Sequence, residues 1–474
     1  MRRGLLLFLL LTSFAVSAQR IVVPPYLQPG NTSSLSKEMK VVLWEVDSVA
    51  GNCKVEFVEG KSFEGATKIT VSKITSQALT FGGRTSYLYR APLTGLKLDA
   101  DYTYRVSLGD QVITTATFRT RTKGNAVRFV AFGDMGAGTP QQAAISYQMH
   151  LQNPQFVLAT GDIAYSYGLA REFKARFFPY YTTLEPSPDK GAPLMQSVPF
   201  YLFPGNHDLY GADLLKFPDG MALYYYSDGP MNAPVTEFTT EVKGPEDRIK
   251  AFKKASEGRF PKMNNFSFDV GNVHIAALDA NSYVNPLDGA LIEWLRRDIQ
   301  SSKADWKVVT FHHPGFNSSK AHYDYQQMRL LSPVLEQLGV DLVINSHVHN
   351  YQRSRPLRFA PKLNEAGDRY VISPEGRVDG KFTLDEKFDG VNTTKADGII
   401  YIVSGSGGAG LYDSPISNNP ELWKHEPADN WVPFTVKLIS DVHSFTLVDV
   451  IGKSLVLKQI NLKGEVLDEI KMTK

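Results

Sequence analysis

Five short apolar runs each end at a side chain that can bind a metal ion, and this pattern restricts the possible fold most. The runs cover residues 127–132, 156–160, 198–203, 307–311 and 341–345. They are followed by Asp134, Asp162, Asn206, His312, and the pair His347 and His349. Because ligands bind beyond the carboxyl ends of strands in open α/β sheets, we expect these side chains to converge. Any one of these residues could simply be a turn residue. Turns alone do not account for six metal-binding side chains at successive strand ends.

Helices separate some of these runs. Leu331, Val334, Leu335 and Leu338 follow helical spacing, and Gly339 closes the pattern. Strands that alternate with helices predict an α/β domain with partly parallel sheets. Nearer the N-terminus, apolar and polar residues alternate over 102–108, which is typical of a half-buried strand. That part of the chain resembles an all-β, fibronectin type III-like sandwich.

These patterns predict a signal peptide at 1–18, the β-sandwich at 19–124 and a catalytic domain at 125–474. A polar, basic linker over 119–125 joins the two domains. A β meander, at about 436–474, closes the catalytic domain. Residues 209–263 fit either a lid over the site or a long excursion of the chain.

The first residues carry the pattern of a secretory signal. Arg2 and Arg3 precede an apolar run too short to cross a membrane, and small residues lead to Ala18. We therefore expect an exported protein, periplasmic or extracellular, with no membrane span. The net charge of +2 falls to zero when 1–18 are removed, which argues against a strongly basic nucleic-acid-binding surface. The single cysteine, Cys53, allows no intrachain disulfide and fits a strand position.

Carboxylates, imidazoles and an amide oxygen together suit iron, manganese or zinc better than calcium. One metal ion would not need six protein ligands and still keep an open position. Two ions bridged by one aspartate fit the count, and such a pair can clamp the attacking and leaving oxygens of a phosphoryl transfer.

The same motifs resemble those of the purple acid phosphatases, within the calcineurin-like phosphoesterases. The matching segments are GDMG at 133–136, GDIAY at 161–165, GNHD at 205–208, VTFH at 309–312 and SHVH at 346–349. The N-terminal sandwich is similar to that of the plant-type, two-domain members, so the resemblance covers nearly the whole mature chain. It implies a four-layer α+β metallophosphoesterase sandwich with a binuclear iron centre.

The resemblance also implies the ligand set. Tyr165 is the most diagnostic residue, because Gly136 stands where broader metallophosphoesterases have a histidine, and a phenolate favours Fe(III). The implied Fe(III) ligands are Asp134, Asp162, Tyr165 and His349. The implied ligands of a divalent ion (iron, zinc or manganese) are the bridging Asp162 together with Asn206, His312 and His347. His312 is assigned rather than His313 because Val309 and Pro314 complete the motif around it.

The implied activity is that of an acid phosphatase acting on small phosphorylated substrates. A metal-bound hydroxide would attack phosphate monoesters. His322 matches the candidate general acid, and His207, next to the ligand Asn206, is a second catalytic candidate that supports the ligands from behind. For His322 the alternative is an exposed loop histidine.

Three positions depart from the family pattern: Ser346 replaces a usual glycine, where a positive φ would be strained, Asp208 replaces glutamate, and Ala321 replaces a second histidine of some relatives. Two other functions compete with the monoesterase: a phosphodiesterase on the same scaffold, and a non-catalytic envelope binding protein.

Overall fold

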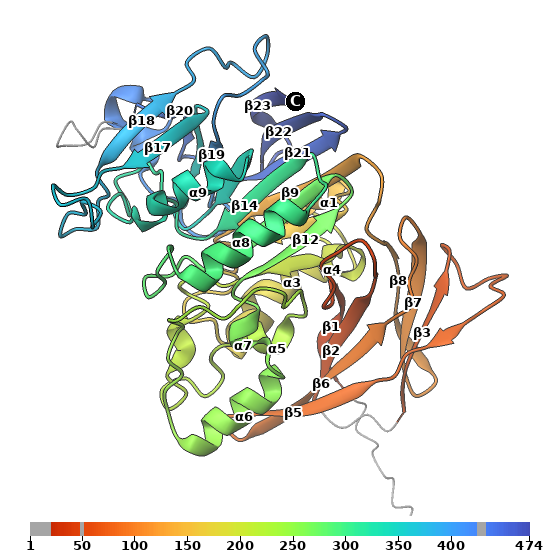
Figure 1. Cartoon of the computed structure of the whole chain (residues 1–474). Helices are drawn as coiled ribbons and strands as arrows, with labels where there is room; N and C mark the ends of the chain where they lie inside the picture. The colour runs from red at the N-terminus through yellow and green to blue at the C-terminus, as the bar shows by residue number, and fades with distance from the viewer. Residues whose placement is uncertain (1–19, 48–51, 424–432) are drawn as a thin grey trace, which may run out of the picture.

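The computed structural model describes residues 20–47, 52–423 and 433–474. The predicted signal peptide lies outside them. The N-terminal part is all-β (Figure 1), with one sheet in the order β1-β2-β6-β5 and another in the order β4-β3-β7-β8. Its strands are β1 (Ile21–Gln28), β2 (Lys40–Val46), β3 (Cys53–Glu59), β4 (Thr70–Val71), β5 (Thr75–Phe81), β6 (Arg84–Leu93), β7 (Asp101–Leu108) and β8 (Gln111–Arg119).

The apolar residues predicted to alternate over 102–108 face the core in β7, but the strand is more than half-buried because Thr103 and Ser107 are covered as well. Tyr104 and Val106 are fully buried in the core of the N-terminal part, whereas Arg105 points the other way and pairs with Glu56 at 2.7 Å. Trp44 stacks on Tyr89 in the same core, with ring centroids 5.1 Å apart. Alternate residues of these strands therefore hold the sheets together by apolar burial.

The predicted linker is anchored by Arg121. This side chain is 5% exposed. It donates to the carboxylate of Glu38 at 2.8 Å and to the carbonyls of Lys37 and Asp269 at 2.7 and 3.2 Å. Because Asp269 belongs to the second part of the chain, Arg121 ties both parts together where the sequence indicated a polar connection.

The remaining chain contains two large sheets. The first has the order β11-β10-β9-β21-β22-β23, in which β9, β10 and β11 are parallel and β21 runs antiparallel to β9. Its strands are β9 (Ala126–Phe132), β10 (Phe156–Ala159), β11 (Phe200–Leu202), β21 (Ser444–Ile451), β22 (Ser454–Asn461) and β23 (Val466–Thr473). The C-terminal meander consists of β21, β22 and β23.

The second sheet has the order β12-β13-β14-β15-β19-β16-β20, and β13, β14, β15 and β19 are parallel. Its strands are β12 (Phe266–Val270), β13 (Val273–Leu278), β14 (Trp306–Phe311), β15 (Leu342–Asn345), β16 (Tyr351–Ser354), β19 (Ile400–Ser404) and β20 (Thr435–Ile439). A separate hairpin is formed by β17 (Leu357–Pro361) and β18 (Gly380–Leu384). The start of the segment predicted as a meander therefore belongs to this sheet, through β20.

The two sheets pack face to face, with helices on their outer faces (Figure 1). In β9, Phe129 and Ala131 face the core between the sheets. Val130 and Phe132 face the outer core, which includes residues of α1 (Pro140–Leu151). On the second sheet, α8 (Gly289–Ser301) and α9 (Ser332–Gln337) cover the other outer face. The fold is therefore the expected four-layer metallophosphoesterase sandwich, preceded by an all-β region.

The shorter helices lie mainly between the strands that carry the motifs. They are α2 (Ala170–Glu172), η1 (Phe173–Phe177), α3 (Phe178–Tyr181), α4 (Leu194–Ser197), η2 (Tyr210–Ala212), α5 (Leu223–Tyr226), α6 (Glu246–Ser256), α7 (Arg259–Lys262), η3 (Gln327–Leu331), η4 (Ser414–Ile416) and η5 (Pro420–Trp423).

The segment 209–263 joins the two parts of the chain. Arg90 of β6 donates to Asp228 at 3.0 Å and to the carbonyl of Tyr225, and the hydroxyl of Tyr26 donates to the carbonyl of Tyr226 at 2.8 Å. Its first residues and Thr240 line the cleft described below. Of the two alternatives, the structure favours a long excursion. Its middle contacts the N-terminal all-β part, and other residues of it form a wall of the cleft.

Candidate metal centre and cleft

Two tight loops place the first two carboxylates. Asp134 and Asp162 follow β9 and β10, and both adopt positive φ, at 57° and 53°. The N–H of Asp134 donates to the carbonyl of Gly161 at 3.2 Å, so the loops are bonded to each other. A Cβ at Gly136 would lie 1.9 Å from the carbonyl oxygen of Ile163. Only glycine fits at 136, and no imidazole can be offered from that position.

Gly136 offers no ligand, but Tyr165 brings its hydroxyl to the neighbouring candidate ligands. Its hydroxyl lies 3.0 Å from Oδ1 of Asp134, 3.0 Å from Oδ2 of Asp162 and 3.0 Å from Nε2 of His349. Its carbonyl accepts a hydrogen bond from Arg176 at 2.7 Å, which fixes the loop. Four potential donor groups, from the loops after the three strands β9, β10 and β15, therefore meet at one point.

His312 reaches Asp162 from the second sheet. Its Nε2 lies 3.3 Å from Oδ1 of Asp162 and 3.1 Å from Oδ1 of Asn206. Its Nδ1 lies 2.9 Å from the carbonyl of Thr160 and 2.9 Å from Oγ of Ser346. The hydrogen bond on Nδ1 orients the ring and leaves Nε2 as the donor atom for a metal.

His347 and His349 complete the set from the loop after β15. The backbone of His347 has φ 68°, and its N–H donates to Oδ2 of Asp134 at 2.8 Å. Nε2 of His347 is buried and has no hydrogen-bond partner among the described residues. Nδ1 of His349 is 2.6 Å from the carbonyl of Gly410, and its ring stacks on Tyr412 with centroids 4.0 Å apart.

The structure thus brings together all seven residues that the sequence suggested as metal ligands, and we call them the ligand cluster. They are Asp134, Asp162, Tyr165, Asn206, His312, His347 and His349. Within this region, two groups of three residues have donor atoms within 4.8 Å of one another. One group is Asp134, Asp162 and His312, and the other is His312, His313 and His347.

The electrostatics of the ligand cluster are set by buried donor groups that lie close together. Burial and the charges of Asp134 and Asp162 hold the pKa of Tyr165 well above its usual range. Burial opposes ionisation of Asp162, but the charge of His312 lowers its pKa below the usual range. Burial and His313 hold the pKa of His347 well below its usual range. A bound cation favours phenolate, carboxylate and neutral imidazole. It would therefore lower the raised pKa of Tyr165, and the lowered pKa values of Asp162 and His347 already favour their metal-binding forms. The residues present fit a metal centre.

His313 faces the cleft instead of the carboxylates. Its ring centroid lies 4.2 Å from that of His347 and 4.9 Å from that of His312. Its Nδ1 is buried and has no partner among the described residues. Burial, followed by the charge of His312, lowers its pKa well below the usual range.

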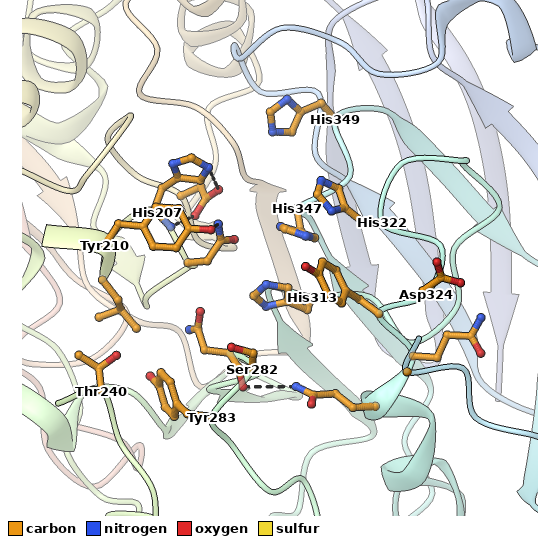
Figure 2. A pocket seen from close by; sticks show the side chains of 18 of the residues that line it. His207, Tyr210, Thr240, Ser282, Tyr283, His313, His322, Asp324, His347 and His349 are labelled. Carbon is orange, nitrogen blue, oxygen red and sulfur yellow. Dashed lines mark hydrogen bonds and ion pairs between the residues drawn. The ribbon is translucent and has the colours of Figure 1, made fainter. Parts of the chain in front are cut away.

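The two histidines suggested for proton transfer line the same cleft (Figure 2). The ring of His322 lies 4.2 Å from the ring of His347 and stacks on Tyr325 at 5.5 Å. Burial, followed by the charge of His349, lowers its pKa. The backbone N–H of His207 donates to Asp162 at 2.9 Å, and its Nδ1 lies 2.7 Å from the carbonyl of Ser166. His322 is therefore not an exposed loop residue.

Two positions that depart from the family pattern have a structural explanation. Positive φ falls on His347 and not on Ser346, so serine is unstrained there; its hydroxyl donates to the carbonyl of Thr160 at 2.5 Å. Asp208 is fully buried and accepts the N–H groups of Ile163 and Gly205 at 3.0 and 2.9 Å. Burial, followed by the charge of Asp162, raises the pKa of Asp208 to about 8.

The cleft above the ligand cluster has a volume of about 400 Å³. Most residues that line this cleft could not be predicted from the sequence, because they lie in loops without a motif. These lining residues include Tyr210, Thr240, Asn281, Tyr283, Asp324, Tyr325, Gln327 and Tyr412.

No helix in the described part of the chain is long and apolar enough to span a membrane.

Comparison with known proteins agrees with this geometry. Residues 127–351 match the family model of the calcineurin-like phosphoesterases. Purple acid phosphatase 15 of Arabidopsis thaliana is 22% identical over 352 residues, which cover 67% of this chain and 59% of that protein. Purple acid phosphatase 23 of the same plant is 26% identical over 329 residues, covering 63% and 65%. The alignments thus span less than two thirds of either relative.

A purple acid phosphatase from yellow lupin (Lupinus luteus) seeds shares the fold, with a TM-score of 0.61 and 16% identity over 95% of this chain and 74% of that one. The four-layer fold and the ligand cluster define a metallophosphoesterase. Within that class, the similarity in sequence and in fold to purple acid phosphatases supports the family that the motifs indicated.

Proposed function

We propose that the protein is an acid phosphatase that hydrolyses phosphate monoesters at a binuclear metal centre. The observation that carries the proposal is the position of the Tyr165 hydroxyl, 3.0 Å from atoms of Asp134, Asp162 and His349. A phenol oxygen among two carboxylates and an imidazole is a donor set suited to a hard trivalent ion. The neighbouring donors from the second sheet suit a divalent ion.

The ligand cluster divides into two sets that share Asp162. Asp134, Asp162, Tyr165 and His349 would hold Fe(III). Asp162, Asn206, His312 and His347 would hold iron, zinc or manganese in the divalent state. The free Nε2 of buried His347 supports the second set. When bound, such a pair lowers the pKa of a water molecule and offsets the charge of the phosphate.

The remaining residues would position the substrate and move its proton. His322 lies beside His347 at the cleft, so it is placed to protonate the leaving oxygen. His207 packs against Tyr165, with ring centroids 4.4 Å apart, and its backbone holds Asp162. Asp208 joins the loop that carries Asp162 to the loop that carries Asn206, through the N–H groups of Ile163 and Gly205, which keeps both ligands in place.

The test is hydrolysis of p-nitrophenyl phosphate by protein purified without chelator, with metal analysis of the same sample. We expect two metal ions per chain, turnover that is highest below neutral pH, and a slower rate on bis(p-nitrophenyl) phosphate. A faster rate on the bis-ester would favour the phosphodiesterase. Bound metal without hydrolysis of either ester would favour a binding protein.

We also propose that the protein is exported and that its N-terminal sandwich is fibronectin type III-like. Support for export is the sequence pattern of residues 2–18. The strand orders β1-β2-β6-β5 and β4-β3-β7-β8 support the second proposal, since they follow the arrangement of immunoglobulin-like sandwiches. Sequencing the mature N-terminus should find Gln19, and an uncleaved Met1 would argue against export.

A further inference from the structure

A buried carboxylate outside the ligand cluster organises one wall of the cleft. Asp279 directly follows β13 and is 1% exposed. Its Oδ1 accepts the backbone N–H of Asn281 at 3.0 Å and the side-chain Nδ2 of Asn281 at 2.8 Å. Its Oδ2 accepts the hydroxyl of Tyr283 at 2.6 Å and Nδ2 of Asn264 at 2.9 Å. Four donors therefore saturate one carboxylate.

These bonds determine which atoms the wall can offer to a substrate. Asn281 and Tyr283 line the cleft together with Thr240, and Figure 2 shows Thr240 and Tyr283 on the side away from His349. One N–H of Asn281 Nδ2 donates to Asp279, and the Oδ1 of Asn281 is an acceptor that a ligand can use. The hydroxyl of Thr240 is within hydrogen-bonding reach of Tyr283, whose own proton goes to Asp279. Since Asn281 and Tyr283 direct donors toward Asp279, the groups that this wall can offer to a ligand are mainly acceptor oxygens.

We propose that this surface, the Asp279 wall (Thr240, Asp279, Asn281 and Tyr283), binds hydroxyl groups of the leaving group. The preferred substrates are then phosphate monoesters of uncharged polyols or sugars, and this inference rests on the proposed monoesterase function. Hydroxyl donors complement the acceptors of the wall. An anionic leaving group would instead meet the acceptor oxygens of the wall, whereas the carboxylate of Asp324, which also lines the cleft, is already paired with Arg377 at 2.5 Å. Asp279 is a positioning residue, because it acts through Asn281 and Tyr283.

The experiment compares two esters whose leaving groups have a similar shape but differ in their hydroxyls: glucose 6-phosphate and cyclohexylmethyl phosphate. For the metal-loaded wild-type enzyme, we expect kcat/KM to favour the sugar ester by at least ~10-fold, as about two neutral hydrogen bonds would provide. Most of the difference should be in KM.

Tyr283→Phe and Asp279→Asn should reduce this preference to ~3-fold or less, while kcat/KM for cyclohexylmethyl phosphate and metal content stay near wild-type values. The matched control is Tyr226→Phe, which also removes a buried tyrosine hydroxyl from a carboxylate, that of Glu45 at 2.8 Å, but at the interdomain contact. The control should keep the wild-type preference.

An unchanged preference in Tyr283→Phe would overturn the inference, even if Asp279→Asn does not fold. A parallel loss of activity on both esters would also overturn it, since that result indicates a structural role only. Hydrolysis of both esters with no preference in the wild type would contradict the Asp279 wall alone. Hydrolysis of neither ester would contradict the monoesterase function as well.

Discussion

The ligand cluster and the Asp279 wall face the same cleft but are built in different ways. Each member of the ligand cluster lies in a loop that directly follows a strand, or in the next few residues, as Tyr165 does after β10. The wall combines Asp279 after β13 with Thr240, which comes from a long segment without a motif. The cluster therefore follows from the fold, whereas the wall depends on loop packing that can vary on the same scaffold.

If this contrast holds, a change in the ligand cluster should abolish all activity, whichever ester is used. Asp162→Ala removes the carboxylate that both metal sets share. We expect kcat/KM to fall by ~10³-fold or more on every ester, with loss of bound metal. Metal analysis and esterase assays check this, with Asp324→Asn as a matched control that removes a cleft carboxylate but retains metal. Full metal content in Asp162→Ala would contradict the bridging role.

His322 lines the cleft beside His347, and its substitution should separate metal binding from proton transfer. His322→Ala should lower kcat by ~10²-fold or more on alkyl esters. The loss should be smaller on p-nitrophenyl phosphate, because p-nitrophenolate is a weak base and its departure depends less on protonation. The visible absorption of the metal centre should remain. Equal losses on both esters, or a bleached centre, would contradict the general-acid role.

A histidine outside the cleft should affect stability and not chemistry. His274 bridges Asp269 and Asp298 at 2.8 and 3.0 Å. Burial lowers its pKa, but hydrogen bonds and charge from the two aspartates outweigh burial and raise it to about 9. Since the folded pKa exceeds the unfolded value near 6.5, the stabilisation is complete below pH ~6.5 and is lost as pH rises through about 9.

The full contribution of His274 is on the order of 3 kcal/mol. His274→Gln should therefore lower Tm most at pH 6 and progressively less toward pH 9, with kcat unchanged. Thermal unfolding of both proteins across this pH range measures the difference. A Tm difference that is constant with pH would show that His274 is not charged in the folded protein.

The smallest effect should come from the residue that orients a ligand. Ser346→Ala removes the hydroxyl that lies 2.9 Å from Nδ1 of His312, while the carbonyl of Thr160 still contacts that nitrogen. We expect metal affinity to fall by ~10-fold without a change in the preference between esters. Competition with a chelator measures it. A shift in ester preference would mean that the two regions are coupled.

The sequence was most informative where function depends on residues close to strand ends. Asp134 and Asp162 could be located because apolar runs precede them, whereas Tyr165 was identified only through the resemblance to the purple acid phosphatases. Whether serine is strained at position 346 could not be predicted from the sequence, because the positive φ falls on the next residue, His347.

The cleft walls could not be predicted in the same way. Thr240 and Tyr283 are brought together by packing of the segment 209–263 against the second sheet, and no local pattern marks either residue. Arg121 also gave no signal, since a buried arginine and an exposed one look alike in a polar linker. Burial of this kind depends on contacts distant in sequence.

The most direct test of the account is the visible spectrum of concentrated protein, measured together with its metal content, for the wild type and Tyr165→Phe. The account predicts two metal ions per chain and a coloured wild type, because a tyrosine phenolate bound to Fe(III) absorbs visible light. The variant should lose the colour while Asp134, Asp162 and His349 remain in place. A colourless, fully active wild type, or a variant with unchanged absorption, would contradict the assignment of Tyr165 as a metal ligand.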